Sequence, residues 1–274
     1  MQCFKNADEI DSVALLDRAF HYGDGCFSTA RLYQGKIELE DLHYARLKNA
    51  IKALHLNVDL SLIKKTLERI ALTGEDSGTL KIIISRGIGQ RGYAIPEHPA
   101  DLYVFFYPQT LSPLSIEYID SGVLTTRMGI TMPELVGIKS LNRLEQVILK
   151  NEAQQHEWIE ALVCDVEAHV VEGVSSNCFI KINGTWITPE LRYNGVHGVM
   201  RSEILARMRH FGIACEQRSI DIAEIANIES LFFCNALSPM KAVQQFEQRK
   251  LDTQSCLELF QTLQLSQMHK YVEA

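Results

Sequence analysis

Apolar residues recur with two different periods along this chain, and these periods predict strands and helices in mixed order. Alternation of apolar and polar residues on both sides of Gln34-Gly35 predicts a β-hairpin. Helical spacing follows at Tyr44, Leu47, Ile51 and Leu54. A second helix is predicted from near Asp59 until Gly74, with an apolar face formed by Leu60, Ile63, Leu67 and Ile70. The segments TLKIIIS and DLYVFFY then read as two strands that bracket a long loop.

The pattern changes between Pro108 and Gly122, where PQTLSPLSIEYIDSG contains two prolines, several serines and no helical period. Such a stretch is typical of a crossover between domains. We therefore expect a small N-terminal α/β domain over residues 1–110, a linker over 111–122 and a larger C-terminal α/β domain over 123–274. The expected fold class is α/β, or α+β, with two domains.

The C-terminal half shows three local signals. Asn142 with Glu145 resembles an N-cap and its N3 partner at the start of a helix. Asn183-Gly184 between two apolar runs predicts a hairpin turn. A further helix is predicted from about Val199 to His210, with Gly212 after its end.

Charge and composition exclude several classes of protein. A formal net charge of −7 argues against a generic nucleic-acid or anionic-membrane surface, because such partners need clustered cations. No apolar run approaches the roughly 20 residues needed to span a bilayer, and the first twelve residues are acidic without an apolar core. We expect a cytoplasmic protein that binds neither nucleic acid nor membrane.

The seven cysteines show no C-x-x-C pair and no cluster with histidines, so we expect reduced thiols and no metal site. Cys164, Cys178 and Cys234 stand in apolar stretches, where cysteine behaves as a small buried hydrophobe.

Lys139 and Glu172 place an amine and a carboxylate in two separate glycine-flanked segments, GIKSLNRLEQ and VVEGVSSN. A lysine amine can form a Schiff base with an aldehyde cofactor, and a carboxylate can keep the ring nitrogen of pyridoxal phosphate protonated. The spacing alone leaves the ordinary alternatives open. Any one of the 13 lysines is most simply a solvated surface amine, and a glutamate at a strand end is often solvated.

The residues from Gly87 to Gly92 match G-x-G-x-x-G directly after a predicted strand, which superficially indicates a dinucleotide site. Pro96 and Pro99 follow, so no helix can continue smoothly from the glycines, and no β-α-β unit with its ribose-binding acid follows. We interpret the match as coincidental and do not expect a dehydrogenase.

Several motifs in one order resemble the fold-type IV pyridoxal-phosphate enzymes. They are YGDGCFSTAR, SRGIGQRGY, GIKSLNRLEQV, VEGVSSNCF, GVHGVMR and CNALSP, and the resemblance runs from about Asp17 to about Lys241. The family includes branched-chain and D-amino acid aminotransferases and aminodeoxychorismate lyases. The motifs CNALSP and SRGIGQRGY are most similar to those of the lyases. The resemblance implies a homodimer with pyridoxal 5'-phosphate between the two domains of each subunit.

The resemblance also implies roles for individual residues. Lys139 would carry the cofactor and transfer protons, and Glu172 would face the ring nitrogen. The other implied cofactor-binding residues are Arg46, Ser175, Ser176, Asn177, Gly198, Val199, Met200, Asn235 and Ala236. Of these, Gly198 to Met200 fit independently the start of a helix, where free N–H groups bind a phosphate.

Substrate recognition is expected from the β-strands and loop of the first domain. The candidate residues are Thr29, Arg31, Arg91, Tyr93 and Tyr107, and Thr29 is also a candidate for the chemistry itself. A substrate with two carboxylates, as the lyases use, requires cations, and guanidinium groups bind carboxylates bidentately. Two residues also have an ordinary structural explanation. Thr29 could simply be a β-branched residue of a strand, and Arg46 could be a surface arginine.

These observations favour a lyase that converts 4-amino-4-deoxychorismate to 4-aminobenzoate and pyruvate, a step toward folate. The alternative within the family is an aminotransferase, which would share every cofactor residue. A catalytically silent binding protein would be expected to lack Lys139 or Glu172, and both are present.

Overall fold

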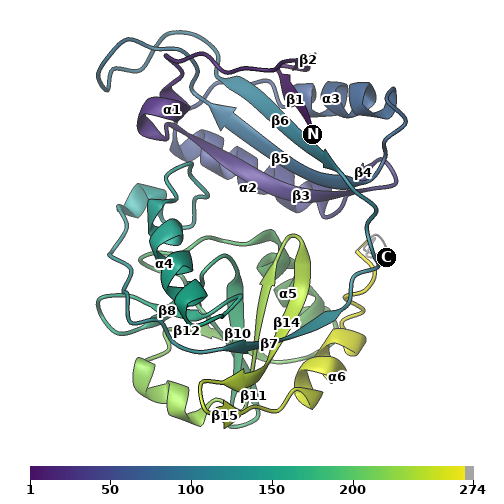
Figure 1. Cartoon of the computed structure of the whole chain (residues 1–274). Coiled ribbons are helices and arrows are strands. Elements are labelled where there is room, and N and C mark those ends of the chain that lie inside the picture. Colours follow the sequence, from purple (N-terminus) through teal and green to yellow (C-terminus); the bar gives the residue numbers. More distant parts are fainter. Residues whose placement is uncertain (269–274) are drawn as a thin grey trace. The chain divides into compact units, whose positions relative to one another are not determined.

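The computed structural model describes residues 1–268, which divide into two compact units. The N-terminal unit contains Met1–Ser112 and Ile138–Asn142, and the C-terminal unit contains Pro113–Gly137 and the chain from Arg143 onward. Both units combine helices with β-sheets (Figure 1), so the expected mixed α/β class is confirmed. No helix within residues 1–268 is both long enough and apolar enough to cross a membrane.

The N-terminal unit is built on a six-stranded sheet with the strand order β2-β1-β6-β5-β3-β4. Its elements are β1 (Gln2–Lys5), β2 (Asp8–Glu9), α1 (Arg18–Tyr22), β3 (Gly25–Tyr33), β4 (Lys36–Ile37), α2 (Glu40–Ala53), α3 (Ser61–Ala71), β5 (Gly78–Ser85) and β6 (Asp101–Pro108). The predicted hairpin at Gln34-Gly35, both predicted helices and the two strands around the long loop are all present. Gln34 and Gly35 both have positive φ, as a two-residue hairpin turn requires.

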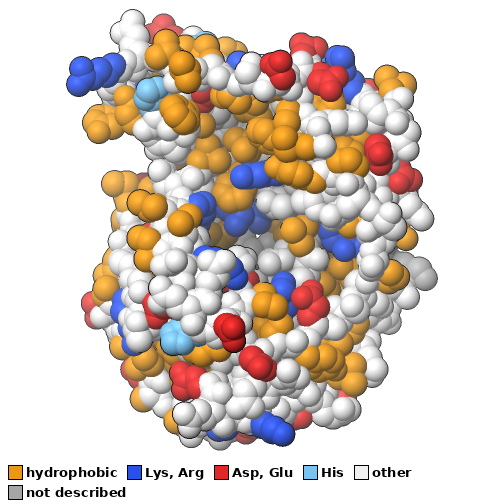
Figure 2. Space-filling view, viewed as in Figure 1, with side chains coloured by type: hydrophobic (Ala, Val, Ile, Leu, Met, Phe, Trp, Pro, Cys, Tyr) orange, Lys and Arg blue, Asp and Glu red, His pale blue; other side chains and the backbone are white. Residues whose placement is uncertain are grey.

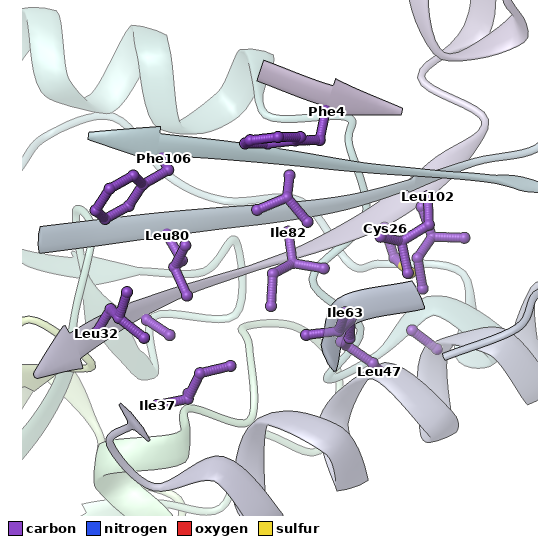
Figure 3. Close-up of a cluster of buried hydrophobic side chains, with 14 of the residues drawn as sticks. Phe4, Cys26, Leu32, Ile37, Leu47, Ile63, Leu80, Ile82, Leu102 and Phe106 are labelled. Atoms are coloured by element: carbon purple, nitrogen blue, oxygen red, sulfur yellow. The ribbon is translucent and has the colours of Figure 1, made fainter. Parts of the chain in front are cut away.

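One face of this sheet forms an apolar core with α2 and α3. Leu32, Leu80 and Ile82 from the strands cluster with Leu47 and Ile63 from the helices (Figure 3). These residues alternate along each strand with residues of the opposite face, because successive side chains of a strand point to opposite sides. The opposite face is therefore left for other groups.

The C-terminal unit is built on a seven-stranded sheet with the order β12-β11-β10-β13-β14-β15, to which β7 adds in parallel with β14. Its elements are β7 (Ile116–Ser121), the 3₁₀ helix Pro133–Leu135, α4 (Leu144–Gln155), β8 (Leu162–Cys164), β9 (Val170–Gly173), β10 (Asn177–Ile182), β11 (Thr185–Pro189), α5 (Val199–His210), β12 (Cys215–Arg218), the 3₁₀ helix Ile222–Asn227, β13 (Ser230–Asn235), β14 (Ser238–Phe246), β15 (Arg249–Lys250) and α6 (Gln254–Thr262). The hairpin at Asn183-Gly184 and the helix Val199–His210 are confirmed.

Two local expectations differ from the structure. The segment expected to be an irregular crossover contains β7, because long-range pairing with β14 outweighs the flanking prolines. The expected capping box is wrong, because α4 begins at Leu144 and Arg143 at its N-cap position makes no side-chain capping bond. Asn142 instead donates a hydrogen bond to the backbone oxygen of Gly23 at 3.3 Å, within the N-terminal unit.

All seven cysteines are free thiols and five of them are buried, including Cys164, Cys178 and Cys234 as expected. On the face that Figure 2 shows, acidic and basic side chains are interspersed over the lower part of the C-terminal unit. This part of the surface has no basic patch of the kind that a nucleic acid requires.

Replacing Leu47 by alanine should test the core on the helical face of the N-terminal sheet. Leu47 is only 1% exposed, so the cavity should lower the free energy of unfolding by about 2–5 kcal/mol. Leu72→Ala is the matched control, because Leu72 is 88% exposed and its loss should cost no more than about 0.5 kcal/mol. Urea unfolding followed by circular dichroism gives both values, and equal effects would contradict this packing.

Candidate functional site

Lys139 lies in the N-terminal unit because its short segment, 138–142, is hydrogen-bonded to β3. The Phe27 N–H donates to the Lys139 carbonyl at 3.0 Å, and the Leu141 N–H donates to the Gly25 carbonyl at 3.0 Å. A Cβ on Gly25 would lie 2.1 Å from a backbone oxygen of β5, so glycine permits this close packing. Nζ of the half-buried Lys139 lies 4.7 Å from the centroid of the Phe27 ring, a cation–π contact. The amine is thus placed by the sheet.

The sheet face opposite to the helices carries the residues around Lys139. Phe27, Thr29 and Arg31 alternate with core residues of β3 and therefore point to this face. Thr29 pairs directly with Lys81 of β5, and directly paired residues project on the same side. Tyr107 of β6 belongs to the same face and is 41% exposed. The structure therefore brings three predicted residues, Thr29, Arg31 and Tyr107, onto the face of Lys139.

Arg31 is occupied within the N-terminal unit. Its Nε forms an ion pair with the Glu38 carboxylate at 2.9 Å, and its Nη2 donates to the Ser112 carbonyl at 3.1 Å. The Arg31 residue is only 9% exposed. Its charge is thus neutralised by the protein itself, although its position on the sheet face agrees with the sequence.

Arg91 and Tyr93 lie on the long loop between β5 and β6. Both are exposed, and Tyr93 is 85% exposed with its ring 5.6 Å from the ring of Tyr22. The loop is held at Gly92, whose N–H donates to the Tyr22 hydroxyl and whose carbonyl accepts from Arg18. No helix follows the glycines before β6, as expected from Pro96 and Pro99.

Arg46 belongs to a buried polar group on the helical face of the same sheet. Its Nη2 donates to the Ser28 hydroxyl, and that hydroxyl lies 2.6 Å from His43 Nδ1. Since a guanidinium only donates, the Ser28 proton points to His43, which accepts it. Burial and, to a lesser degree, the Arg46 charge lower the pKa of His43 to about 3, so His43 is neutral at physiological pH.

The guanidinium of Arg46 retains hydrogen-bonding capacity. Its Nε is buried and has no hydrogen-bond partner among the described residues. Burial lowers the pKa of Arg46 to about 10, which still leaves the group protonated at neutral pH. A buried, charged donor without a partner is costly unless an anion binds it. The site thus fits the phosphate of the implied cofactor.

In the C-terminal unit, Glu172 is held in place by two neighbours. Its Oε2 accepts from the Val196 N–H at 3.0 Å and from Asn177 Nδ2 at 3.3 Å. Asn177 Nδ2 also donates to the Val196 carbonyl at 2.9 Å. A Cβ on Gly198 would lie 2.0 Å from Asn177 Oδ1, so glycine is needed there. The predicted residues Glu172, Asn177 and Gly198 are therefore neighbours, and Glu172 is buried at 6% exposure.

Sequence reasoning missed Arg143, which is coupled electrostatically to Glu172. Burial lowers the pKa of Arg143, while the charges of Glu172 and Glu145 act in the opposite direction. Its place within LNRLEQ gave no signal of this role, because the interaction spans 29 positions of the sequence. A half-buried cation beside Glu172 favours the ionised carboxylate.

Sequence reasoning also missed Glu160, which is 1% exposed and organises the serines of VEGVSSN. Its Oε2 accepts from the Ser175 N–H at 3.0 Å, and its Oε1 accepts from the Ser175 hydroxyl and from the Ser176 hydroxyl, the latter at 2.8 Å. Asn235 Nδ2 donates to the Ser176 hydroxyl at 3.1 Å. The predicted residues Ser175, Ser176 and Asn235 are thus brought together, with Ala236 next in the chain.

The N-terminus of α5 offers backbone donors for an anion. Gly198 occupies the N-cap position and no side chain caps the helix there. Val199 and Met200 of the first turn are buried. Arg201 is turned into the unit, where it donates to the Thr188 hydroxyl at 3.2 Å and to the Pro189 carbonyl at 2.8 Å. Free N–H groups at such an N-terminus suit a phosphate.

The predicted site residues fall into one group in each unit. The N-terminal group contains Lys139, Thr29, Arg31, Arg46, Arg91, Tyr93 and Tyr107, and the C-terminal group contains Glu172, Ser175, Ser176, Asn177, Gly198, Val199, Met200, Asn235 and Ala236. Within residues 1–268, no three His, Cys, Asp or Glu side chains gather in a way that would hold a metal ion.

The pKa of His43 predicts a specific dependence of stability on pH. Because the pKa falls from 6.5 to about 3 on folding, the unfolded chain binds the additional proton between these values. This contribution is complete above pH 6.5 and is lost as the pH falls toward 3. His43→Gln should flatten the fall by up to about 1.4 kcal/mol per pH unit. Urea unfolding from pH 7 to 4 measures the slope, exposed His21→Gln is the control, and an unchanged slope in His43→Gln would contradict the buried neutral histidine.

Comparisons with known proteins agree with the motifs. The model of the amino-transferase class IV family matches residues 25–246. An aminodeoxychorismate lyase from Vibrio harveyi is 32% identical over 82% of this chain and 84% of its own. A putative branched-chain-amino-acid aminotransferase from Methanocaldococcus jannaschii is 25% identical over 94% of this chain and 91% of its own.

The same result comes from solved structures. A crystal structure of 4-amino-4-deoxychorismate lyase from Pseudomonas aeruginosa has a TM-score of 0.83 and 31% identity, and covers 94% of this chain and 98% of the lyase chain. The resemblance to fold-type IV enzymes is thereby confirmed. This chain belongs to the amino-transferase class IV family of enzymes.

Proposed function

We propose that this enzyme is a pyridoxal-phosphate-dependent lyase that converts 4-amino-4-deoxychorismate to 4-aminobenzoate and pyruvate, a reaction that would serve folate synthesis. The observation that carries the proposal is the position of Lys139, whose amine lies over Phe27 on the sheet face that also holds Thr29. Two aminodeoxychorismate lyases are 32% and 31% identical to this chain in sequence, and this identity supports the choice of substrate.

The residues that would hold the cofactor follow from the donors described above. In the N-terminal unit, the donor for the phosphate would be Arg46. In the C-terminal unit, the donors would come from the N-terminus of α5 and from Ser175, Ser176, Asn177 and the Asn235-Ala236 turn. Glu172 would accept from the protonated ring nitrogen. When bound, pyridoxal phosphate supplies an aldehyde that condenses with amines and a ring that withdraws electrons.

The chain's own residues would then bind, orient and move protons. Lys139 Nζ would remove the proton from carbon 4 of the substrate ring. The bond from carbon 3 to the enolpyruvyl oxygen breaks, and the electron pair leaves with that oxygen. A proton delivered to the enolpyruvate methylene gives pyruvate, so one proton is taken and one is returned. The Thr29 hydroxyl lies on the face of Lys139 and would orient the leaving group or relay this proton.

Neighbouring donors would position Glu172 for its role. The Val196 N–H and the Asn177 amide both reach Oε2. Donors to a carboxylate favour its charged form, as does the nearby charge of Arg143. The arrangement therefore favours an anion opposite the ring nitrogen, which keeps that nitrogen protonated.

An aminotransferase acting on D- or branched-chain amino acids remains the second candidate, because such enzymes are also among the relatives of this chain. They are 24–26% identical, against 32% for the lyase from Vibrio harveyi and 24% for the lyase from Bacillus subtilis. The cofactor residues would be the same for both reactions. The difference would lie in how the substrate face around Thr29, Tyr107, Arg91 and Tyr93 receives the substrate's carboxylates.

A homodimer is part of the proposal. The N-terminal unit exposes several large apolar side chains on and before α1 and on the β5–β6 loop, namely Leu15, Leu16, Phe20, Tyr93 and Ile95. Exposed apolar groups that gather in this way often mark a protein interface. A second copy of this chain is the partner we propose for them.

The reaction itself is tested by supplying purified protein and pyridoxal phosphate with 4-amino-4-deoxychorismate, and separately with D-alanine or leucine plus 2-oxoglutarate. We expect 4-aminobenzoate and pyruvate from the first mixture at a far higher rate than any amino transfer. Lys139→Ala should abolish the reaction, and borohydride should fix the pyridoxyl group on the peptide of Lys139. The exposed Lys52→Ala is the matched control. Labelling of another lysine, or faster amino transfer, would contradict the proposal.

Replacing Glu172 by glutamine should remove the negative charge of the side chain while keeping its shape. Gln retains an oxygen that can accept from the Val196 N–H, so the fold and the cofactor should remain. Loss of one such electrostatic contact typically lowers the rate by on the order of 10² to 10³. The exposed Glu190→Gln is the control. We would measure kcat and the bound cofactor by absorbance, and a wild-type kcat in Glu172→Gln would argue against this role.

A further inference from the structure

Arg31 of β3 and Lys81 of β5 lie next to Thr29 on the substrate face of the N-terminal sheet, and their surroundings differ. Arg31 is neutralised by Glu38 at 2.9 Å and is further bound to the Ser112 carbonyl. Lys81 has neither an ion pair nor a hydrogen bond of this kind within the described chain. Among residues 1–268, no carboxylate lies within 4.0 Å of its ammonium group and no hydrogen bond to it occurs. Lys81 is therefore a cation of this face whose charge no carboxylate of residues 1–268 compensates.

The position of Lys81 is fixed by strand register. It pairs with Thr29 of β3 on one side and with Phe105 of β6 on the other. Its Nζ lies 5.2 Å from the centroid of the Phe27 ring, the same ring that Lys139 Nζ approaches to 4.7 Å. Both amines thus approach the same aromatic ring.

A half-buried ammonium group next to aromatic rings is poorly hydrated, and it is stabilised by an anion that arrives with a ligand. The Phe27 ring contributes only a weak attraction to each amine. A carboxylate of the substrate is such an anion.

We propose that Lys81, rather than Arg31, binds one carboxylate of the substrate while Lys139 acts on the carbon that bears the substrate amine. This inference rests on the proposed function and names the carboxylate subsite within it. Lys81 determines specificity for a dicarboxylate, because a substrate without the second carboxylate leaves its ammonium group unpaired. Lys81 could instead be an ordinary solvated lysine. Its position in the middle of β5, paired with Thr29 and Phe105, argues against this alternative.

The test uses the cofactor-loaded enzyme and chorismate, which has both carboxylates and no amine and therefore binds without reacting. Lys81→Met keeps the length of the side chain and removes its charge. It should weaken chorismate binding in calorimetry and raise KM for 4-amino-4-deoxychorismate, each by about 10- to 100-fold, with kcat changed much less. Lys81→Arg should restore most of the affinity, and Lys36→Met, an exposed lysine of β4, should behave as wild type.

The outcomes separate this inference from the proposed function. Wild-type affinity for chorismate in Lys81→Met would overturn the inference, even if the wild-type enzyme makes 4-aminobenzoate. Loss of pyridoxal phosphate from Lys81→Met with unchanged chorismate binding would overturn it too, because Lys81 would then serve the cofactor. If wild type binds chorismate through Lys81 and makes no 4-aminobenzoate, the proposed function fails and the carboxylate subsite stands.

Discussion

The pairing of residues 138–142 with β3 is the interaction on which the candidate site depends. Two backbone hydrogen bonds, one from Phe27 to Lys139 and one from Leu141 to Gly25, attach a segment from the middle of the chain to the first sheet. Backbone bonds inside a sheet are fixed by register, so the reactive amine is fixed relative to the side chains of β3. Gly25 is required for this arrangement, because a side chain there would collide with β5.

The two faces of the six-stranded sheet have different roles: one packs the apolar core, and the other carries the candidate site residues. Its helical face is filled by apolar side chains and includes one buried polar group, in which the Ser28 hydroxyl is hydrogen-bonded to both His43 and Arg46. The other face carries the polar and aromatic groups beside Lys139. Because side chains alternate along a strand, neighbours such as Ser28 and Thr29 serve different faces. Core packing therefore holds the positions of the chemical groups without taking part in the chemistry.

Local signals in the sequence were sufficient for most helices and hairpins, since the turns at Gln34-Gly35 and Asn183-Gly184 and the helix Val199–His210 rest on neighbouring residues. The failures have a common cause in long-range contacts. β7 forms because β14 pairs with it, and Asn142 leaves the helix cap because Gly23 offers a carbonyl. The motifs also identified Lys139, Glu172 and the serines near it. Glu160 gave no signal, because its partners Ser175 and Ser176 are recognisable only once the chain is folded.

The charged residues show why residue type is a poor guide to a site. Arg31, Arg201 and Lys81 are all cations near sequence motifs, and each is at least partly buried. Arg31 is neutralised by Glu38, and Arg201 is bound by the hydroxyl and carbonyl groups of β11. A ligand anion would have to displace Glu38 from Arg31, and it would have to displace the neutral acceptors that already bind the donors of Arg201. Lys81 has no such partner among the described residues, and an enzyme for a dicarboxylate needs a cation in this state before the substrate arrives.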